Sequence, residues 1–152
     1  MNTSKIKIMQ IMLTAFCIGI ISFAAVAISL NKQSLYFDIA PASDPTGLYP
    51  VFPLLGLAII FMGLFMFKNQ LDKLPEDVGA DAKIAAYQTA FIIRSAFLEG
   101  ASLMNIVGFL LSANAAFLIV PAIAVAVMIF TRPTKQVVID ALKLSYPDTE
   151  KL

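Results

Sequence analysis

Histidine is absent from the 152-residue chain, and cysteine occurs only once, at Cys17. Without imidazole the chain lacks the commonest metal ligand and the side chain that ordinarily changes charge near neutral pH. A single cysteine cannot form a disulfide within the chain. The sequence also lacks a nucleophile elbow, a phosphate-binding glycine loop and a metal-spaced set of ligands. These absences predict a protein that is not an enzyme and that holds no metal or other cofactor.

Charged residues are scarce as well. They make up 14% of the chain, with a net charge of +1, whereas an ordinary soluble domain has about 25%. The near balance of charges leaves no basic surplus to attract nucleic acid. Hydrophobic residues make up 59% of the chain, more than a soluble fold of this size can bury. We therefore expect an integral membrane protein whose main contact is the lipid bilayer.

Four apolar stretches are candidates for membrane-spanning helices, because a bilayer core of about 30 Å requires about 20 mostly apolar residues. They cover approximately residues 8–30, 48–67, 85–112 and 115–130. Pro50 and Pro53 fall in the first turn of the second stretch, where a missing N–H is tolerated. Pro121 lies inside the fourth stretch and is expected to kink it. The predicted fold is all-α, with residues 1–132 forming a four-helix transmembrane domain.

The segments between these stretches read as two loops and a tight turn. Residues 31–50 hold three prolines and a glycine, which favours a loop. Residues 68–81 form a charged connector. The short sequence "SANA" at residues 112–115 suits a tight turn that makes the third and fourth stretches an antiparallel hairpin.

The C-terminal segment, residues 133–152, is predicted to be a second unit on the cytoplasmic side. Val137, Val138, Ala141 and Leu142 recur at helical spacing, which favours a short amphipathic helix at the membrane surface. A solvated polar tail with some helical content is the alternative.

Positive charges predict the orientation of the chain. The loop at residues 31–50 carries only Lys32, and Lys and Arg collect on the cytoplasmic side of membrane proteins. We therefore expect a multi-pass protein of the cell membrane with both termini in the cytoplasm. The first stretch resembles a cleavable signal peptide, with "AVA" at residues 25–27, but its length favours a retained anchor. The other basic residues are Lys5, Lys7, Lys68, Lys73, Lys83, Arg94, Arg132, Lys135, Lys143 and Lys151.

The third stretch is unusual because it carries polar and charged side chains. At 100° per residue, Arg94, Ser95, Glu99, Ser102 and Asn105 share an arc of about 140°, and we interpret this arc as an intramembrane polar face. Arg94 and Glu99 lie at different edges of the arc, so we expect no direct pair between them. The opposite side is expected to face lipid and carries Ile93, Phe97, Met104, Val107 and Leu111.

Each of the two charged residues of this face has alternative interpretations. Arg94 either anchors the helix at the headgroups or serves as a functional counter-charge. Glu99 either locks the bundle as a protonated or hydrogen-bonded carboxyl, or binds an ion or proton as part of a transport function. Small residues beside the arc, Gly100, Ala101 and Gly108, would let a partner helix come close.

Three resemblances accompany these patterns. The segment from Arg94 to Phe130, "RSAFLEGASLMNIVGFLLSANAAFLIVPAIAVAVMIF", resembles the helical hairpin of the proteolipid c subunit of rotary ATP synthases, which implies ion binding at Glu99. Glu99 lies in the first helix of this hairpin, whereas that family has its carboxylate in the second. The segment "PTGLYPVFPLLGLAIIFMGLFMF" is similar to the small membrane subunit of tripartite tricarboxylate transporters. The pattern "RxAxxEG" with a later "RPT" resembles small, uncharacterised bacterial four-helix membrane proteins.

Two functions follow as hypotheses. The first is an accessory or structural subunit of a larger membrane complex, because four helices with short loops leave little room for an independent substrate path. Self-association or another membrane subunit would supply the partner. The second is an oligomeric translocator of an ion, a proton or a solute that uses the intramembrane carboxylate of Glu99.

Overall fold

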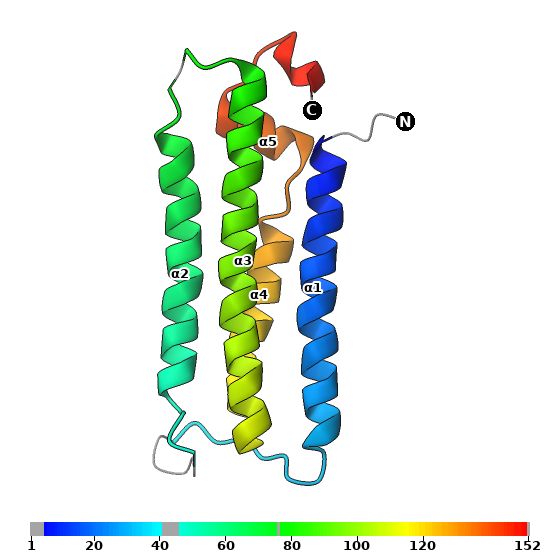
Figure 1. Ribbon diagram of the computed structural model, residues 1–152, viewed down its shortest axis with the longest axis vertical. Coiled ribbons are helices and arrows are strands. Elements are labelled where there is room, and N and C mark those ends of the chain that lie inside the picture. Colours follow the sequence, from blue (N-terminus) through cyan, green and yellow to red (C-terminus); the bar gives the residue numbers. More distant parts are fainter. Residues whose placement is uncertain (1–4, 41–45, 76, 152) are drawn as a thin grey trace.

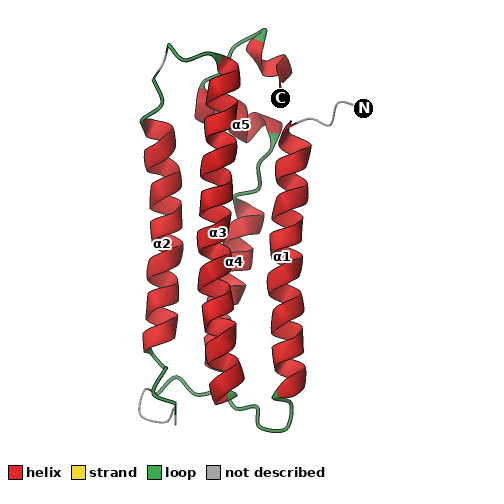
Figure 2. Cartoon of the chain, in the orientation of Figure 1, coloured by secondary structure: helices red, strands yellow, loops and turns green. Residues whose placement is uncertain are grey.

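The computed structural model describes residues 5–40, 46–75 and 77–151, and the regular structure within these ranges is helical (Figure 2). The expectation of an all-α fold is confirmed. Parts of the predicted loop at residues 31–50, namely 41–45, and Glu76 of the charged connector lie outside the described residues. The elements are α1 (Lys5–Leu30), α2 (Val51–Asp72), α3 (Ala80–Ser112), the 3-10 helix η2 (Ala115–Leu118), α4 (Ile119–Phe130), α5 (Lys135–Leu142) and the 3-10 helix η3 (Asp148–Lys151).

The four longer helices run up and down beside one another, with α3 in the centre (Figure 1). α3 contacts α1, α2, α4 and α5, and the most extensive of these contacts is with α2. α1 begins at the same end of the bundle at which α5 lies (Figure 1). The segment Ala115–Phe130 and the helix α5 meet at an angle of 82°, so α5 lies across the end of the bundle.

Three helices, α1, α2 and α3, are long and apolar enough to cross a membrane, and the bent pair that contains α4 and α5 would make a fourth. α2 continues to Asp72 and α3 begins at Ala80, so both extend beyond the apolar stretches that predicted them. The residues at these ends include Lys, Gln, Leu and Ala, which have high helix propensity. The helices are therefore longer than their hydrophobic segments.

The fourth stretch differs from its expected form at Pro121. The chain first makes the 3-10 turn η2, capped by Asn114, and becomes α-helical only at Ile119. Pro121 is thus the third residue of α4, in the first turn, where the backbone N–H needs no partner within the helix. Pro121 is therefore not in the interior of α4, because the change from 3-10 to α-helix comes just before it. The expected kink at Pro121 stays a prediction.

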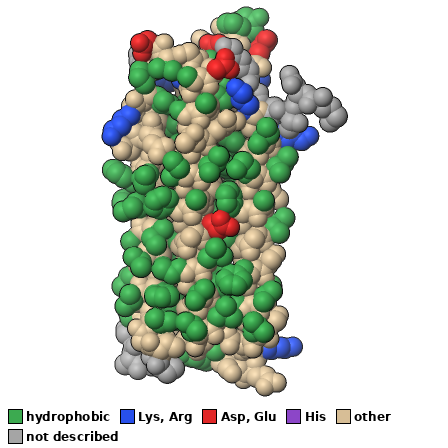
Figure 3. Space-filling model, in the orientation of Figure 1, with side chains coloured by type: hydrophobic (Ala, Val, Ile, Leu, Met, Phe, Trp, Pro, Cys, Tyr) green, Lys and Arg blue, Asp and Glu red, His purple; other side chains and the backbone are tan. Residues whose placement is uncertain are grey.

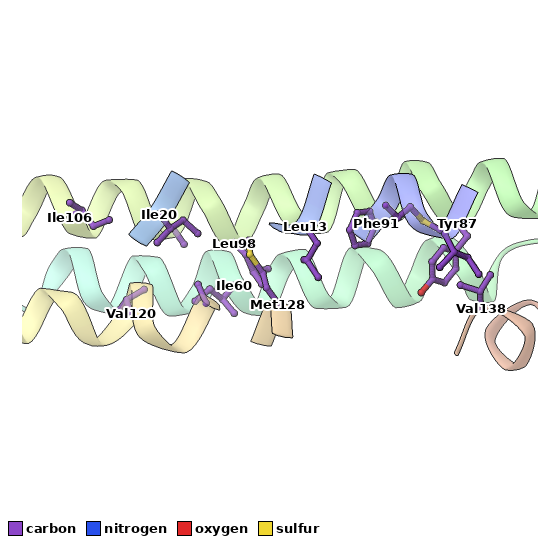
Figure 4. Close-up of a cluster of buried hydrophobic side chains, with 14 of the residues drawn as sticks. Leu13, Ile20, Ile60, Tyr87, Phe91, Leu98, Ile106, Val120, Met128 and Val138 are labelled. Atoms are coloured by element: carbon purple, nitrogen blue, oxygen red, sulfur yellow. The ribbon is translucent and has the colours of Figure 1, made fainter. Parts of the chain in front are cut away.

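A continuous core runs along the bundle and receives side chains from every α-helix (Figure 4). Large apolar side chains also cover the outside, where Phe61 is 71% exposed and Phe130 is 88% exposed. Figure 3 shows such side chains over the whole middle of one face. A continuous apolar exterior of this kind marks contact with lipid or with another protein.

The C-terminal helix α5 turns its apolar residues toward the bundle. Val138 and Leu142 are buried and belong to the same core as Ile84 and Tyr87 of α3, whereas Val137 and Ala141 are exposed. Thr134 caps the helix by accepting a hydrogen bond from the N–H of Val137 at 3.3 Å. The two buried residues therefore cover the end of the bundle. That the helix lies on a membrane surface stays a prediction.

Two glycines let α2 approach α3 closely. A Cβ on Gly63 would lie 2.7 Å from Cβ of Phe97, and a Cβ on Gly56 would overlap the amide of Asn105. A Cβ is fixed to the backbone, so at Gly63 the two helices would have to move apart. By contrast, a Cβ on Gly100 of α3 would meet none of the described atoms within 4 Å.

Gly63→Ala and Gly100→Ala form a matched pair that tests this packing. We expect Gly63→Ala to lower the free energy of unfolding in mild detergent by about 1–3 kcal/mol, the usual effect of overpacking. Gly100→Ala should leave it unchanged or raise it by up to about 1 kcal/mol, because alanine favours helix over glycine. Equal effects at the two positions would contradict a close α2–α3 contact.

Candidate functional site on the third helix

The structure divides the predicted polar face of α3 into a buried part and an outer part. Arg94, Ser95, Ser102 and Asn105 are buried inside the bundle. Glu99 is half-buried and lies at the edge of α3 that meets α1. The five residues therefore do not form one site, and the contacts of their side chains differ.

The two serines are satisfied by their own helix. The Ser95 hydroxyl donates to the carbonyl of Phe91 at 2.9 Å, and the Ser102 hydroxyl donates to the carbonyl of Leu98 at 2.7 Å. A hydroxyl bonded four residues back within the same helix is common where a serine is kept from water. These side chains provide small, neutral packing surfaces inside the bundle.

Asn105 links α3 to the start of α2. Its amide nitrogen donates to the carbonyl of Ala101 at 2.9 Å and to the carbonyl of Phe52 at 3.2 Å. The amide oxygen is buried and has no hydrogen-bond partner among the described residues. Gly56 lies directly against this amide. The bond to Phe52 favours the helix register that gives the buried amide nitrogen both of its acceptors.

Arg94 is buried at 4% exposure, and its guanidinium contacts two kinds of group. One nitrogen donates to the carbonyl of Thr131, the residue that ends α4, at 3.2 Å. The guanidinium carbon lies 4.3 Å from the ring centre of Phe67 and 5.5 Å from that of Phe91. The carbonyl end of a helix carries partial negative charge, and ring faces attract cations.

The side chain of Arg94 is therefore buried inside the bundle, whereas one of the two interpretations expected it to reach the headgroups. A guanidinium cannot lose its charge inside a protein, so its burial requires such groups around it. The aromatic cluster continues beyond Phe67, whose ring packs edge to face with Tyr87 at 5.5 Å. The sequence contained no sign that Phe67 and Thr131 would meet Arg94, because they come from two other parts of the chain.

Glu99 has a different environment from the rest of the polar face. It forms no hydrogen bond or ion pair with any residue that the structure describes, Arg94 included. Its Oε1 lies 3.7 Å from the position of a Cβ on Gly19 of α1. Along α3 it is about 20 Å from Ser112 at 1.5 Å per residue. The carboxyl thus lies near the middle of the bundle, at its surface.

The surface around Glu99 is apolar. Between Asp81 and Asp140, Glu99 is the only acidic residue of the sequence. Figure 3 shows charged side chains gathered mainly at the ends of this face and an acidic one in the middle, among hydrophobic neighbours. Gly19 and Gly100, on either side, are exposed. A carboxyl in such a place has open space beside it for a group from outside the chain.

The outer side of α3 matches the expected lipid-facing side only in part. Val107 and Leu111 are exposed as expected, whereas Phe97 contacts Gly63 of α2. The exposed stripe also follows Ile92, Ala96 and Gly100. The difference arises because the glycines of α2 draw that helix over one side of α3. Glu99 lies at the border of this exposed stripe.

Asn114 is a structural residue that reading of the sequence missed. Its amide pairs with the backbone of Asp38, donating to the carbonyl at 2.8 Å and accepting from the N–H at 3.1 Å. It also accepts from the N–H of Ala116 at 3.0 Å and so caps η2. Tyr36 adds a bridge, accepting from the N–H of Ala115 at 2.8 Å. Asparagine before a helix is a known cap, but its pairing with the loop has no sequence signal.

No family model, curated protein or solved structure matches the chain. The resemblances to the proteolipid c subunit, to the tricarboxylate transporter subunit and to small bacterial membrane proteins therefore remain predictions. Among the described residues no group of Cys, Asp and Glu could hold a metal ion.

A double-mutant cycle tests the placement of Arg94. Arg94→Met, Phe67→Leu and the double variant should show a coupling energy of about 0.5–2 kcal/mol in the free energy of unfolding in mild detergent, as expected for a desolvated cation on a ring face. Phe61→Leu on the outside of α2 is the control. Its effect should add to that of Arg94→Met within about 0.5 kcal/mol. Full additivity in both cycles would place the guanidinium elsewhere.

Proposed function

We propose that the chain is a structural or accessory subunit of a larger membrane complex and that it assembles through the face around Glu99. One observation carries this proposal: a carboxyl lies at the surface of an apolar bundle, at its middle, without a partner among the described residues. In hydrocarbon an ionised side chain at that depth costs about 3 kcal/mol. A second protein that donates hydrogen bonds or a positive charge to Glu99 would remove this cost.

The residues beside Glu99 suit a helix as the partner. Gly19, Ala96 and Gly100 are exposed and have little or no side chain. Membrane helices associate where small residues let the backbones approach, and polar groups across such contacts strengthen them. The partner is either a second copy of this chain or another membrane subunit.

We further propose that the bundle crosses the cell membrane with both termini in the cytoplasm. α1 begins, α2 ends and α3 begins at the end of the bundle where α5 lies (Figure 1). Lys5, Lys7, Lys68 and Arg132 belong to this end, whereas the loop at the other end has Lys32. The positive-inside rule assigns the basic end to the cytoplasm.

Reporter fusions give a direct test of this orientation. A reporter after Gln33 should be active outside the cytoplasm, and reporters after Asp77 and after Lys143 should be active inside it. The reason is that positively charged short loops resist translocation across the membrane. An external signal at Asp77 would contradict the proposed arrangement of the first two helices.

An oligomeric translocator is the second candidate function. The same observation favours it, because an unpartnered and half-exposed carboxyl could take up and release a proton or cation. The buried polar side chains Ser95, Ser102 and Asn105, however, bond to nearby backbone carbonyls. They do not form a chain of contacts that leads to Glu99. A transport path would therefore have to form between copies rather than inside one.

Two substitutions of Glu99 separate these functions. If the carboxyl holds a partner, Glu99→Leu should weaken the complex extracted from native membranes by about tenfold, because a donor of the partner would be left buried without an acceptor. Glu99→Gln keeps the shape and the acceptor oxygen and should preserve the complex. Size measurement in mild detergent, after crosslinking in the membrane, gives the result. Thr89→Leu, elsewhere on the outer side of α3, is the control and should have no effect.

Flux into reconstituted vesicles completes the test. If Glu99→Gln preserves the complex but abolishes a proton or cation flux, the translocator becomes the better proposal. If Glu99→Leu changes neither assembly nor flux, Glu99 serves neither function.

A further inference from the structure

A groove runs along the surface between α1 and α4. Its upper part, toward the end with α5, has a volume of about 720 Å³ and is lined by residues that include Lys7, Ile11, Ile18 and Arg132. Its lower part, of about 560 Å³, is lined by apolar residues such as Ile21 and Ala122. Both parts share Ile129. The groove is therefore basic at its mouth and apolar below.

Contacts from two helices fix the basic mouth. The amide of Gln10 on α1 donates to the carbonyl of Pro133 at 2.8 Å. From inside the bundle, Arg94 donates to the carbonyl of Thr131 at 3.2 Å. The backbone on both sides of Arg132 is thus held between α1 and α3. The side chain of Arg132 is exposed and lines the groove together with Lys7.

The floor of the upper part is also formed by a contact between the two helices. The thiol of Cys17 on α1 lies 3.8 Å from the sulfur of Met128 on α4. Leu13 lies beside it on the inner side of the lining. Above this floor α4 ends at Phe130, and the upper part is lined by α1 together with Ile129 and Arg132. Ile11, Ile18 and Ile129 are open to the surroundings.

The dimensions of the upper part match one leaflet of a bilayer. From Lys7 to Ile18 the helix rises about 16 Å at 1.5 Å per residue, and half of a hydrocarbon core is about 15 Å. Lys7 and Arg132 are then at the depth of the headgroups and Ile18 is near the middle. Of the described residues that line this part, none is acidic.

We propose that the upper groove binds an anionic diacyl phospholipid, with its phosphate between Lys7 and Arg132 and an acyl chain along Ile11 and Ile18. Basic pockets between helices on the cytoplasmic side favour anionic headgroups, and a groove with both features fits an amphiphile better than it fits an apolar helix. The inference rests on the proposed membrane location and orientation, but it does not depend on the role of Glu99.

Tryptophan fluorescence tests this site, because the natural chain contains no tryptophan. Ile11→Trp places a reporter in the groove, one turn below Lys7. Phe65→Trp on α2, about one turn below Lys68, is the matched control, since Ile11 is 58% exposed and Phe65 is 60% exposed. The full-length variants are reconstituted in phosphatidylcholine vesicles that contain either brominated phosphatidylglycerol or brominated phosphatidylcholine. Quenching then measures the lipid in contact with each reporter.

We expect the preference for phosphatidylglycerol over phosphatidylcholine to be about fivefold greater at Ile11→Trp than at Phe65→Trp. One additional basic residue at an anionic membrane surface contributes about this factor. Adding Lys7→Gln and Arg132→Gln should reduce the preference at Ile11→Trp below that of the control, which keeps Lys68. Both residues are exposed, so the fold should be unchanged, as circular dichroism can verify.

Three results would overturn the proposal. Equal preference at the two positions would mean that the groove holds ordinary surrounding lipid. A preference at Ile11→Trp that survives the loss of both basic residues would mean that another feature selects the lipid. Quenching at Phe65→Trp but not at Ile11→Trp would mean that a protein, such as a second copy, covers the groove. If neither reporter is quenched, the membrane location itself fails, which is a separate outcome.

Discussion

The packing of α3 against α1, α2, α4 and α5 is the constraint on which the rest of the structure depends. A helix in this central position needs small residues where its neighbours approach. Every polar group that it buries also needs a hydrogen-bond partner. Ser95 and Ser102 meet both requirements through bonds to their own helix. Gly63 on α2 supplies the remaining space. Glu99 stands apart because it lies at the edge of α3 that meets α1, at the border of the exposed stripe, and forms no hydrogen bond with a described residue.

The link between α4 and α5 depends on the same central helix. Arg94 reaches from α3 to the carbonyl of Thr131, the residue after α4, while Gln10 holds the link from α1. This arrangement turns α5 across the end of the bundle and directs Arg132 outward. A buried cation thus shapes the surface at which the chain would meet an anionic headgroup. The interior and the basic mouth of the groove are connected through a few residues of backbone.

Composition and periodicity predicted the coarse fold well, because long apolar stretches and strong helix formers act locally. They predicted less well where distant segments meet. Pro121 was expected in a helix interior, but Asn114 starts a 3-10 turn that moves the proline into a first turn. The polar residues of α3 were identifiable from their spacing, since helical geometry fixes their directions. The contacts of Arg94 with Phe67 and of Asn114 with Asp38 could not be predicted, because each joins segments that are far apart in the sequence.

Photo-crosslinking from position 92 tests the central claim, that the side of α3 bearing Glu99 is covered by protein. A photoreactive amino acid in place of Ile92, which is 39% exposed, would lie two turns from Glu99 on nearly the same side of α3, and one in place of Phe61 would mark the outside of α2. After illumination of native membranes, the account predicts a crosslinked protein band from position 92 and mainly lipid adducts from position 61. Lipid adducts alone from position 92 would contradict it, because the carboxyl would then face the bilayer without a partner.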